Sequence, residues 1–291
     1  MTFCLFDVNT YQNDVENRVD DLFIQFAKGP ESRTYVSNQY FRYPYHICRA
    51  QYLDQCPSGL ASVYIQSTAG GVFSNDRLKS RFHALPDSAA YVTSQASTIV
   101  HRMDHGTADL TVVIRAESGS FFEYLPDPVI LFPKSRLTSR VFIELDPQAT
   151  VLIADSFLIH DPNERGDVFS EFRNEIEVKG LDGRLLCRDR NILTGAMYTG
   201  EMLGVMGSHR VHGTFFLLRQ NLPIELICSE FRKESENHLE TYTGVSVLPN
   251  DCGIWARAVS ADSVSLRATL HGLWRVARKS IVGAFPNDRK K

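Results

Sequence analysis

Residues 140–159 read RVFIELDPQATVLIADSFLI. Two runs rich in β-branched and aromatic residues, Arg140–Leu145 and Ala149–Ile159, lie on either side of the sequence Asp-Pro-Gln. Runs of this composition, bounded by Asp and Pro, are typical of β-strands. Because only three residues separate the two runs, one strand follows the other with no helix between them.

The same pattern extends from about Arg33 to Arg190. Further predicted strands are Leu60–Thr68, Ala90–Arg102 and Leu110–Ala116, with Gly, Pro, Asp and Asn between the runs. A parallel βαβ fold places an amphipathic helix between successive strands. The lack of such helices disfavours a Rossmann-like sheet and predicts a mainly β body of many short strands.

Two helices are expected in the C-terminal third. In Leu222–Glu240, Ile224, Ile227 and Phe231 share one face at spacings of three and four. Ser260–Gly283 is also predicted to be a helix. Its apolar stripe consists of Leu266, Leu270, Leu273, Trp274, Ala277 and Ile281. The basic residues Arg275, Arg278 and Lys279 in its last turns suit the helix dipole, and Gly283 suits the helix end. We expect a single domain over residues 1–291, with residues 1–25 unassigned.

Composition excludes several classes of protein. The chain has 291 residues, 43% of them hydrophobic, and a formal net charge of -3, so no global field favours nucleic acid or an anionic membrane. No RNP-like aromatic motif is present. The opening MTFCLFDVNT lacks the features of a signal peptide, and apolar runs fall short of the roughly 20 residues that span a bilayer. Six cysteines without C-x-x-C spacing predict free thiols in a cytoplasmic protein.

The stretch STAGGVFSNDRL contains the glycine pair Gly70-Gly71. A Walker A loop requires Gly-Lys-Ser/Thr, and no lysine follows at that position, so nucleotide binding is disfavoured. A tight turn that uses the conformational freedom of glycine is preferred. Asp76 and Arg77, directly after the turn, are expected either to fix the loop or to face a partner.

Other candidate residues are histidines and acids. His101 and His105 surround Arg-Met-Asp, and His209 and His212 form a second pair, so a metal site is one interpretation and solvent-facing turn histidines are another. The candidate acids for general acid/base work or cation binding are Asp76, Glu123, Asp161, Glu164, Asp167 and Glu171. The basic C-terminal stretch predicts a helix packed on the body, ending in a solvated cationic tail. No motif requires an enzyme.

Taken in order, these segments resemble the urease accessory protein family UreD, also called UreH. Gly70-Gly71 leading to Asp76-Arg77-Leu78 is similar to the family's Gly-Gly turn and Gly-Asp-x-Leu, with Ser74-Asn75 in place of a second glycine pair. The remaining matches are a TTQ-like strand, an LE-x-LP segment, a GR…GE-x-F segment and a W…R…G…P close; their residues are Thr93, Gln95, Glu123, Pro126, Arg165, Gly166, Asp167, Phe169, Trp274 and Arg278. The resemblance covers about residues 43–286.

The resemblance implies a β-helical or stacked-sheet body with two helices and a non-enzymatic scaffold. Family members bind UreF, through it the GTPase UreG, and on another face apo-urease, so that nickel reaches the urease active site. The resemblance thus implies no tightly bound cofactor and a transient nickel(II) passage, for which we expect Asp76 and Glu123, followed by Asp167 and Glu171, as lining acids. The alternative is a small metal-dependent enzyme on a β scaffold that uses His101, His105 and nearby carboxylates.

Overall fold

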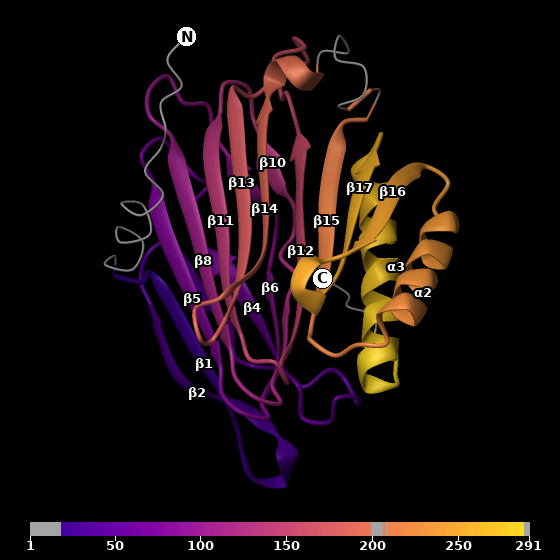
Figure 1. Ribbon diagram of the computed structural model, residues 1–291. Coiled ribbons are helices and arrows are strands. Elements are labelled where there is room, and N and C mark those ends of the chain that lie inside the picture. Colours follow the sequence, from indigo (N-terminus) through magenta and orange to yellow (C-terminus); the bar gives the residue numbers. More distant parts are fainter. Residues whose placement is uncertain (1–18, 199–205, 208, 288–291) are drawn as a thin grey trace.

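The computed structural model describes residues 19–198, 206–207 and 209–287 and contains two facing β-sheets with two helices against one of them (Figure 1). Within the described residues, sheet A has the strand order β14 (Leu185–Thr194), β13 (Glu171–Gly180), β11 (Arg136–Leu145), β8 (Ala108–Ala116), β5 (Arg77–Ala84), β1 (Leu22–Lys28) and β2 (Thr34–Phe41). Sheet B has the order β16 (Thr241–Val247), β17 (Gly253–Ser260), β15 (Val211–Leu218), β12 (Thr150–Ile159), β9 (Phe121–Tyr124), β6 (Ala89–Ser94), β4 (Ala61–Ser67) and β3 (Tyr45–Ile47). The short strands β7 (Thr98–Val100) and β10 (Val129–Leu131) extend sheet B beside β12.

The chain alternates between the two sheets. From β4 it crosses to β5, returns to β6, crosses to β8 and continues in this way to β13, so the strands of this stretch that are neighbours within a sheet are parallel. The strands added at the sheet edges, such as β2, β14 and β15, pair antiparallel. In sheet A, Val112 lies opposite both Ser80 and Val141. This stacking of successive chain turns confirms the predicted mainly β, β-helical body.

One detail of the strand prediction was wrong, and part of the stretch left unassigned is now placed. The run Ala90–Arg102 forms two strands, because the chain bends after Ser94, whose hydroxyl accepts the Asp127 backbone N–H at 2.8 Å, and then pairs with β10. The unassigned N-terminal stretch ends in a core strand, since β1 begins at Leu22 and lies parallel to β5.

The main core lies between the sheets. Aromatic rings meet there across the two layers, with Phe122 of β9 6.0 Å from Phe26 and 5.8 Å from Phe82, measured between ring centroids. All three side chains are fully buried. Removing this apolar area from water supplies the main drive that holds the layers together.

Both predicted helices are confirmed with shorter bounds, α2 at Ile224–Glu236 and α3 at Ser263–Val282. Asp262 caps α3 by accepting the backbone N–H groups of Val264 and Ser265, and Gly283 ends it at φ 78°. Helix α3 packs on the outer face of sheet B, and α2 packs beside it (Figure 1). In the described part of the chain, no helix combines the length and apolar character needed to cross a membrane.

Candidate functional site

The motif residues fall mainly into two places. One is the turn end, defined here as residues 70–77, 101–107, 132–135 and 160–171, where the chain enters the strands of sheet A. The other is the helix lock, defined as Asp54, Glu123, Trp274 and Arg278, where α3 meets sheet B. Thr93, from the TTQ-like strand, is buried in β6 near the lock and donates its hydroxyl to the Leu125 carbonyl at 2.6 Å.

At the turn end, the glycine pair forms a tight turn, as predicted. Gly71 has φ 138°, and a Cβ placed there would lie 2.5 Å from the Ile99 carbonyl oxygen. Asp76 braces the same turn, because its carboxylate accepts the Phe73 backbone N–H at 2.8 Å. Arg77 is exposed at the start of β5.

The histidines at the turn end make contacts of different kinds. The His101 ring stacks on Phe73 with a 4.5 Å centroid distance, and its Nε2 lies 2.9 Å from the Gly70 carbonyl oxygen. His105 is exposed in the following turn. Among the residues described, no three His, Cys, Asp or Glu side chains gather closely enough to hold a metal ion. The alternative interpretation of a metal-dependent enzyme therefore gains no support from the described residues.

The loop before β13 is organised by Asp161. Its carboxylate accepts the backbone N–H groups of Asn163 at 3.0 Å, Arg165 at 2.7 Å and Asp167 at 3.0 Å. Desolvation raises the pKa of Asp161, but the backbone hydrogen bonds lower it by more and hold it below its ordinary value. The side chains of Arg165 and Asp167 are left exposed by this arrangement.

The four acids expected to line one passage do not lie together. Asp76 precedes β5 and Glu171 begins β13, with β8 and β11 between these strands. Three strand spacings of about 4.8 Å place them on the order of 14 Å apart. Glu171 is paired with Arg173 at 2.7 Å.

Glu123 belongs to the helix lock and is fully buried. Its carboxylate accepts Trp274 Nε1–H at 2.7 Å and Arg278 Nε–H at 2.9 Å, and it also forms a short ion pair with Arg278 Nη2. These bonds occupy the oxygens that a passing cation would need. These contacts therefore favour a role for Glu123 in the packing of α3 over a role in lining a passage.

Arg278, a motif residue that was expected to suit the C-terminal dipole of the helix, is a fully buried cation. It donates Nη1–H to the Cys56 carbonyl at 2.8 Å, and Nη2 lies 3.5 Å from Asp54. Burial lowers the pKa of Arg278, but Glu123 and Asp54 more than compensate and leave it raised. The lock thus joins β9, the loop before β4 and α3.

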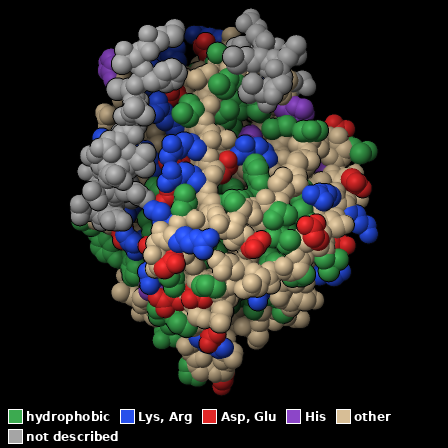
Figure 2. Space-filling model, in the orientation of Figure 1, with side chains coloured by type: hydrophobic (Ala, Val, Ile, Leu, Met, Phe, Trp, Pro, Cys, Tyr) green, Lys and Arg blue, Asp and Glu red, His purple; other side chains and the backbone are tan. Residues whose placement is uncertain are grey.

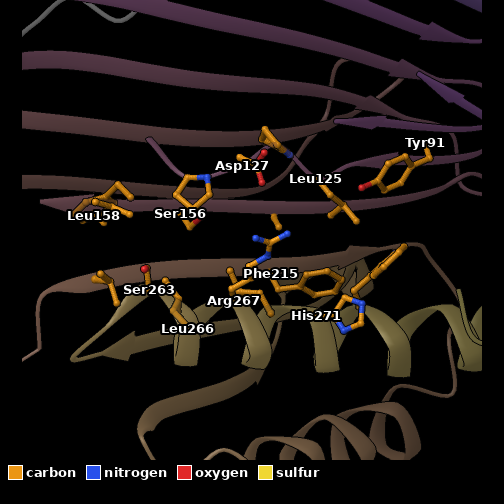
Figure 3. Close-up of a pocket in the computed structure, with 17 residues that line it drawn as sticks. Tyr91, Leu125, Asp127, Ser156, Leu158, Phe215, Ser263, Leu266, Arg267 and His271 are labelled. Carbon is orange, nitrogen blue, oxygen red and sulfur yellow. The ribbon is translucent and has the colours of Figure 1, made fainter. Parts of the chain in front are cut away.

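Beside the lock, a pocket opens between sheet B and α3 (Figure 3). Pro126, one of the motif residues, lines it with Tyr91 and Trp274. Figure 3 shows the Arg267 side chain pointing from α3 toward the wall that carries Asp127. Gln95, in contrast, lies at the bend after β6, where its backbone N–H donates to the Ile65 carbonyl at 2.9 Å.

A polar seam lies between the sheets, defined as Asp155, Asn174, Asp189, His212 and Arg257; of these residues, only His212 was a candidate from the sequence. Asn174 of β13 donates to the Asp155 carboxylate of β12, and Arg257 donates to both oxygens of Asp189 at 2.6 and 2.7 Å. Burial raises the pKa of Asp155 to about 6, and burial, aided by Arg257, lowers the pKa of His212 to about 3. The sequence signals for the seam were His212, interpreted as one of a pair with His209, and Asp155 within the mainly apolar run of β12.

Two atoms of the seam have unused bonding capacity. Asn174 Oδ1 and Arg257 Nε are buried without a hydrogen-bond partner. The hydroxyl of Tyr198 is also buried and unpaired; its ring is near Phe157, on which His212 stacks. Buried polar groups without a partner are uncommon in folded proteins. Each of these three atoms therefore has the capacity for a further hydrogen bond.

Outside the seam, the charges of sheet A are balanced. Figure 2 shows Lys and Arg side chains gathered over β13 and β14. Arg190 pairs with Glu175 at 2.8 Å, and Lys179 pairs with Glu177 at 2.8 Å. The first pair joins neighbouring strands and the second lies within β13, and both limit the field that these strands present to a partner.

The comparisons with known proteins identify the class to which this β-helical body with two packed helices belongs. The family model described as UreD urease accessory protein matches residues 20–290. The chain therefore belongs to the UreD family of urease accessory proteins.

Its relatives carry the same description. The chain is 40% identical to "Urease accessory protein UreD 1" of Pseudomonas syringae pv. syringae, covering 92% of this chain and 94% of that protein. It is 38% identical to the protein of the same name in Pseudomonas syringae pv. tomato, with the same coverage. A relative in Methylorubrum populi is 32% identical over 91% of this chain and 90% of its own length.

Proposed function

We propose that this protein is a cytoplasmic, non-enzymatic scaffold of urease maturation. It binds UreF, and through UreF the GTPase UreG, on one face and apo-urease on another, and it provides a passage for nickel(II). Membership of the UreD family over residues 20–290 is the observation that carries this proposal. No nucleic acid or membrane takes part.

The structure supports a scaffold role through its rigidity. The helix lock fixes α3 on sheet B by a buried carboxylate, guanidinium and indole. Two surfaces on different sides of the molecule are thereby held in a constant relation, the turn end and the face formed by α2 and α3 (Figure 1). A protein that bridges two partners needs this constancy.

Nickel is the cargo of the proposed passage and not a resident cofactor. Asp76, Asp167 and Glu171 at the turn end offer carboxylates near the surface, and Asp155 and Asn174 offer oxygen atoms between the sheets. Separate weak contacts of this kind let an ion enter and leave, whereas a closed site would retain it. Glu123 is excluded from this route.

Co-expression with UreF, UreG and apo-urease tests the scaffold. We expect a tagged chain to retain all three proteins and urease activity to depend on it. Retention of none of them would refute the proposal. Metal analysis of the purified chain after dialysis should find less than one nickel per chain, and a stoichiometric ion that survives dialysis would contradict a passage.

Two substitutions at Asp76 separate its two possible roles. Asp76→Asn keeps an oxygen that can accept the Phe73 N–H but removes the charge, whereas Asp76→Ala removes both. If the carboxylate serves nickel, both variants lower urease activation at equal expression. Normal activation by Asp76→Asn, with loss only in Asp76→Ala, would show that Asp76 only braces the turn.

A further inference from the structure

Two cysteines meet between the sheets at a point that the proposed function does not use. Cys187 lies on β14, the edge strand of sheet A, and Cys252 directly precedes β17 of sheet B. Both are free thiols within the same core cluster, with exposed fractions of 6% and 0%. The two thiols interact, because each is the largest influence on the pKa of the other.

The surrounding contacts hold the two cysteines together. The short helix η3 (Pro249–Asp251) is attached to β14 on the Cys187 side, because Asn250 Nδ2 donates to the Leu186 carbonyl at 2.7 Å. Arg184 donates to Asn250 Oδ1 at 3.1 Å. Cys252 is the next residue after η3 and Cys187 the next after Leu186, so these bonds bring the segment that carries Cys252 to the part of β14 that carries Cys187.

We propose that Cys187 and Cys252 are a modification site, a dithiol that forms a reversible disulfide between the two sheets. Facing strands of packed sheets are joined in this way in antibody domains. In reducing compartments such bonds are transient and sense oxidants. The pair is thus an oxidant-sensitive cross-link between β14 of sheet A and the segment that directly precedes β17 of sheet B.

The electrostatics of the pair fit this chemistry. The interaction with Cys187 lowers the pKa of Cys252, while the interaction with Cys252 and burial raise the pKa of Cys187. Asp189, near Cys187, also disfavours a negative charge there. The thiolate, which is the reactive form, therefore resides on Cys252.

The oxidant is a small peroxide that can enter when the edge strand opens locally. The Cys252 thiolate attacks one oxygen of hydrogen peroxide, the O–O bond breaks, and a sulfenic acid and hydroxide form. The sulfur of Cys187 then attacks the Cys252 sulfur and displaces its hydroxyl group, which leaves as water with the thiol proton. In sum, two thiols lose two electrons and two protons, and one peroxide becomes two waters.

The test treats the folded, full-length chain with hydrogen peroxide and counts free thiols after denaturation. We expect six thiols to fall to four, since the sequence contains six cysteines. Trypsin should release residues 185–188 linked to residues 234–257, because these are the tryptic peptides that contain the two cysteines. A reducing agent should restore six thiols, and the oxidised chain should melt at a higher temperature than the reduced one.

Matched variants define the site. Cys228→Ala removes another buried cysteine, on α2, and should still form the cross-link. Cys187→Ala and Cys252→Ala should both abolish it. Oxidation confined to Cys48 or Cys56, without the linked peptides in the unsubstituted chain, would overturn the proposal. The measurement needs no urease, so it stands apart from the scaffold function.

Discussion

The buried pair of Glu123 and Arg278 leads to a prediction about single residues. Glu123→Gln keeps an oxygen for Trp274 but leaves a buried guanidinium without its main counter-charge. Breaking a buried ion pair on one side costs about 3–5 kcal/mol. We expect a loss of this size in the free energy of unfolding, measured with urea.

Asp104→Asn is the matched control for this experiment. It breaks the pair of Arg102 and Asp104, whose side chains are 60% and 65% exposed. Exposed ion pairs contribute little to stability, so this loss should be much smaller. Equal losses in the two variants would show that the helix lock is not what holds α3 in place.

Asp155 leads to a prediction about pH. Burial raises its pKa from an ordinary value of 3.8 to about 6, so the folded state binds a proton that the unfolded state releases. The contribution of Asp155 to stability is therefore full below pH 4 and is lost as pH rises to 6, by at most roughly 3 kcal/mol. Asp155→Asn should lack this part of the pH dependence.

Urea unfolding of both proteins at pH 4 and pH 7 measures the effect. The stability of Asp155→Asn relative to the unsubstituted chain should be greater at pH 7 than at pH 4. Asn174 can donate to the new amide oxygen, so the local hydrogen bond persists in the variant. The same difference at both pH values would contradict a raised pKa in the folded chain.

At this scale, the sequence predicted residue types better than residue roles. Glu123 and Arg278 were both identified, but 155 residues separate them in the chain, and no local pattern shows that they pair. An acid next to a Leu-Pro sequence looks the same whether it meets a cation, a guanidinium or water. Its role follows from burial, which depends on tertiary packing.

The turn that contains the glycine pair allows a prediction about a single element. Gly71→Ala would place a methyl group 2.5 Å from the Ile99 carbonyl oxygen at φ 138°, whereas the Cβ of Gly70→Ala would meet nothing within 4 Å. We expect Gly71→Ala to cost roughly 1–3 kcal/mol of stability and Gly70→Ala to be close to neutral. Thermal melting of the two variants checks this, and equal effects would contradict the turn geometry.

The elements themselves were mostly predictable, because periodicity is local. The spacing of Ile227, Phe231 and Leu266 gave both helices, and Asp262 and Gly283 mark the ends of α3. The bend after Ser94 was not predictable, since it depends on pairing with β10, more than thirty residues later. Strand ends are set by partners that a single run of sequence does not contain.

At the scale of the whole molecule, the two distant surfaces should engage different partners. Phe73 at the turn end is 48% exposed, and Leu226 on α2 is 65% exposed. Phe73→Asp and Leu226→Asp should each weaken capture of one partner, UreF or apo-urease, at least about tenfold while sparing the other. An aspartate in place of the apolar side chain would bury a charge in the complex and remove the apolar contribution of that side chain to binding. The other surface, which the substitution does not touch, should bind its partner as before.

Pull-down of each variant with UreF alone and with apo-urease alone measures this separation, with equal melting temperatures as the control for folding. A firmly held α3 keeps the two surfaces independent, because a change at one surface then leaves the geometry of the other unchanged. Glu123→Gln, which weakens the helix lock, should therefore impair the partner that also responds to Leu226→Asp. Loss of both partners in either surface variant, or of neither in both, would contradict a scaffold with two separate docking faces.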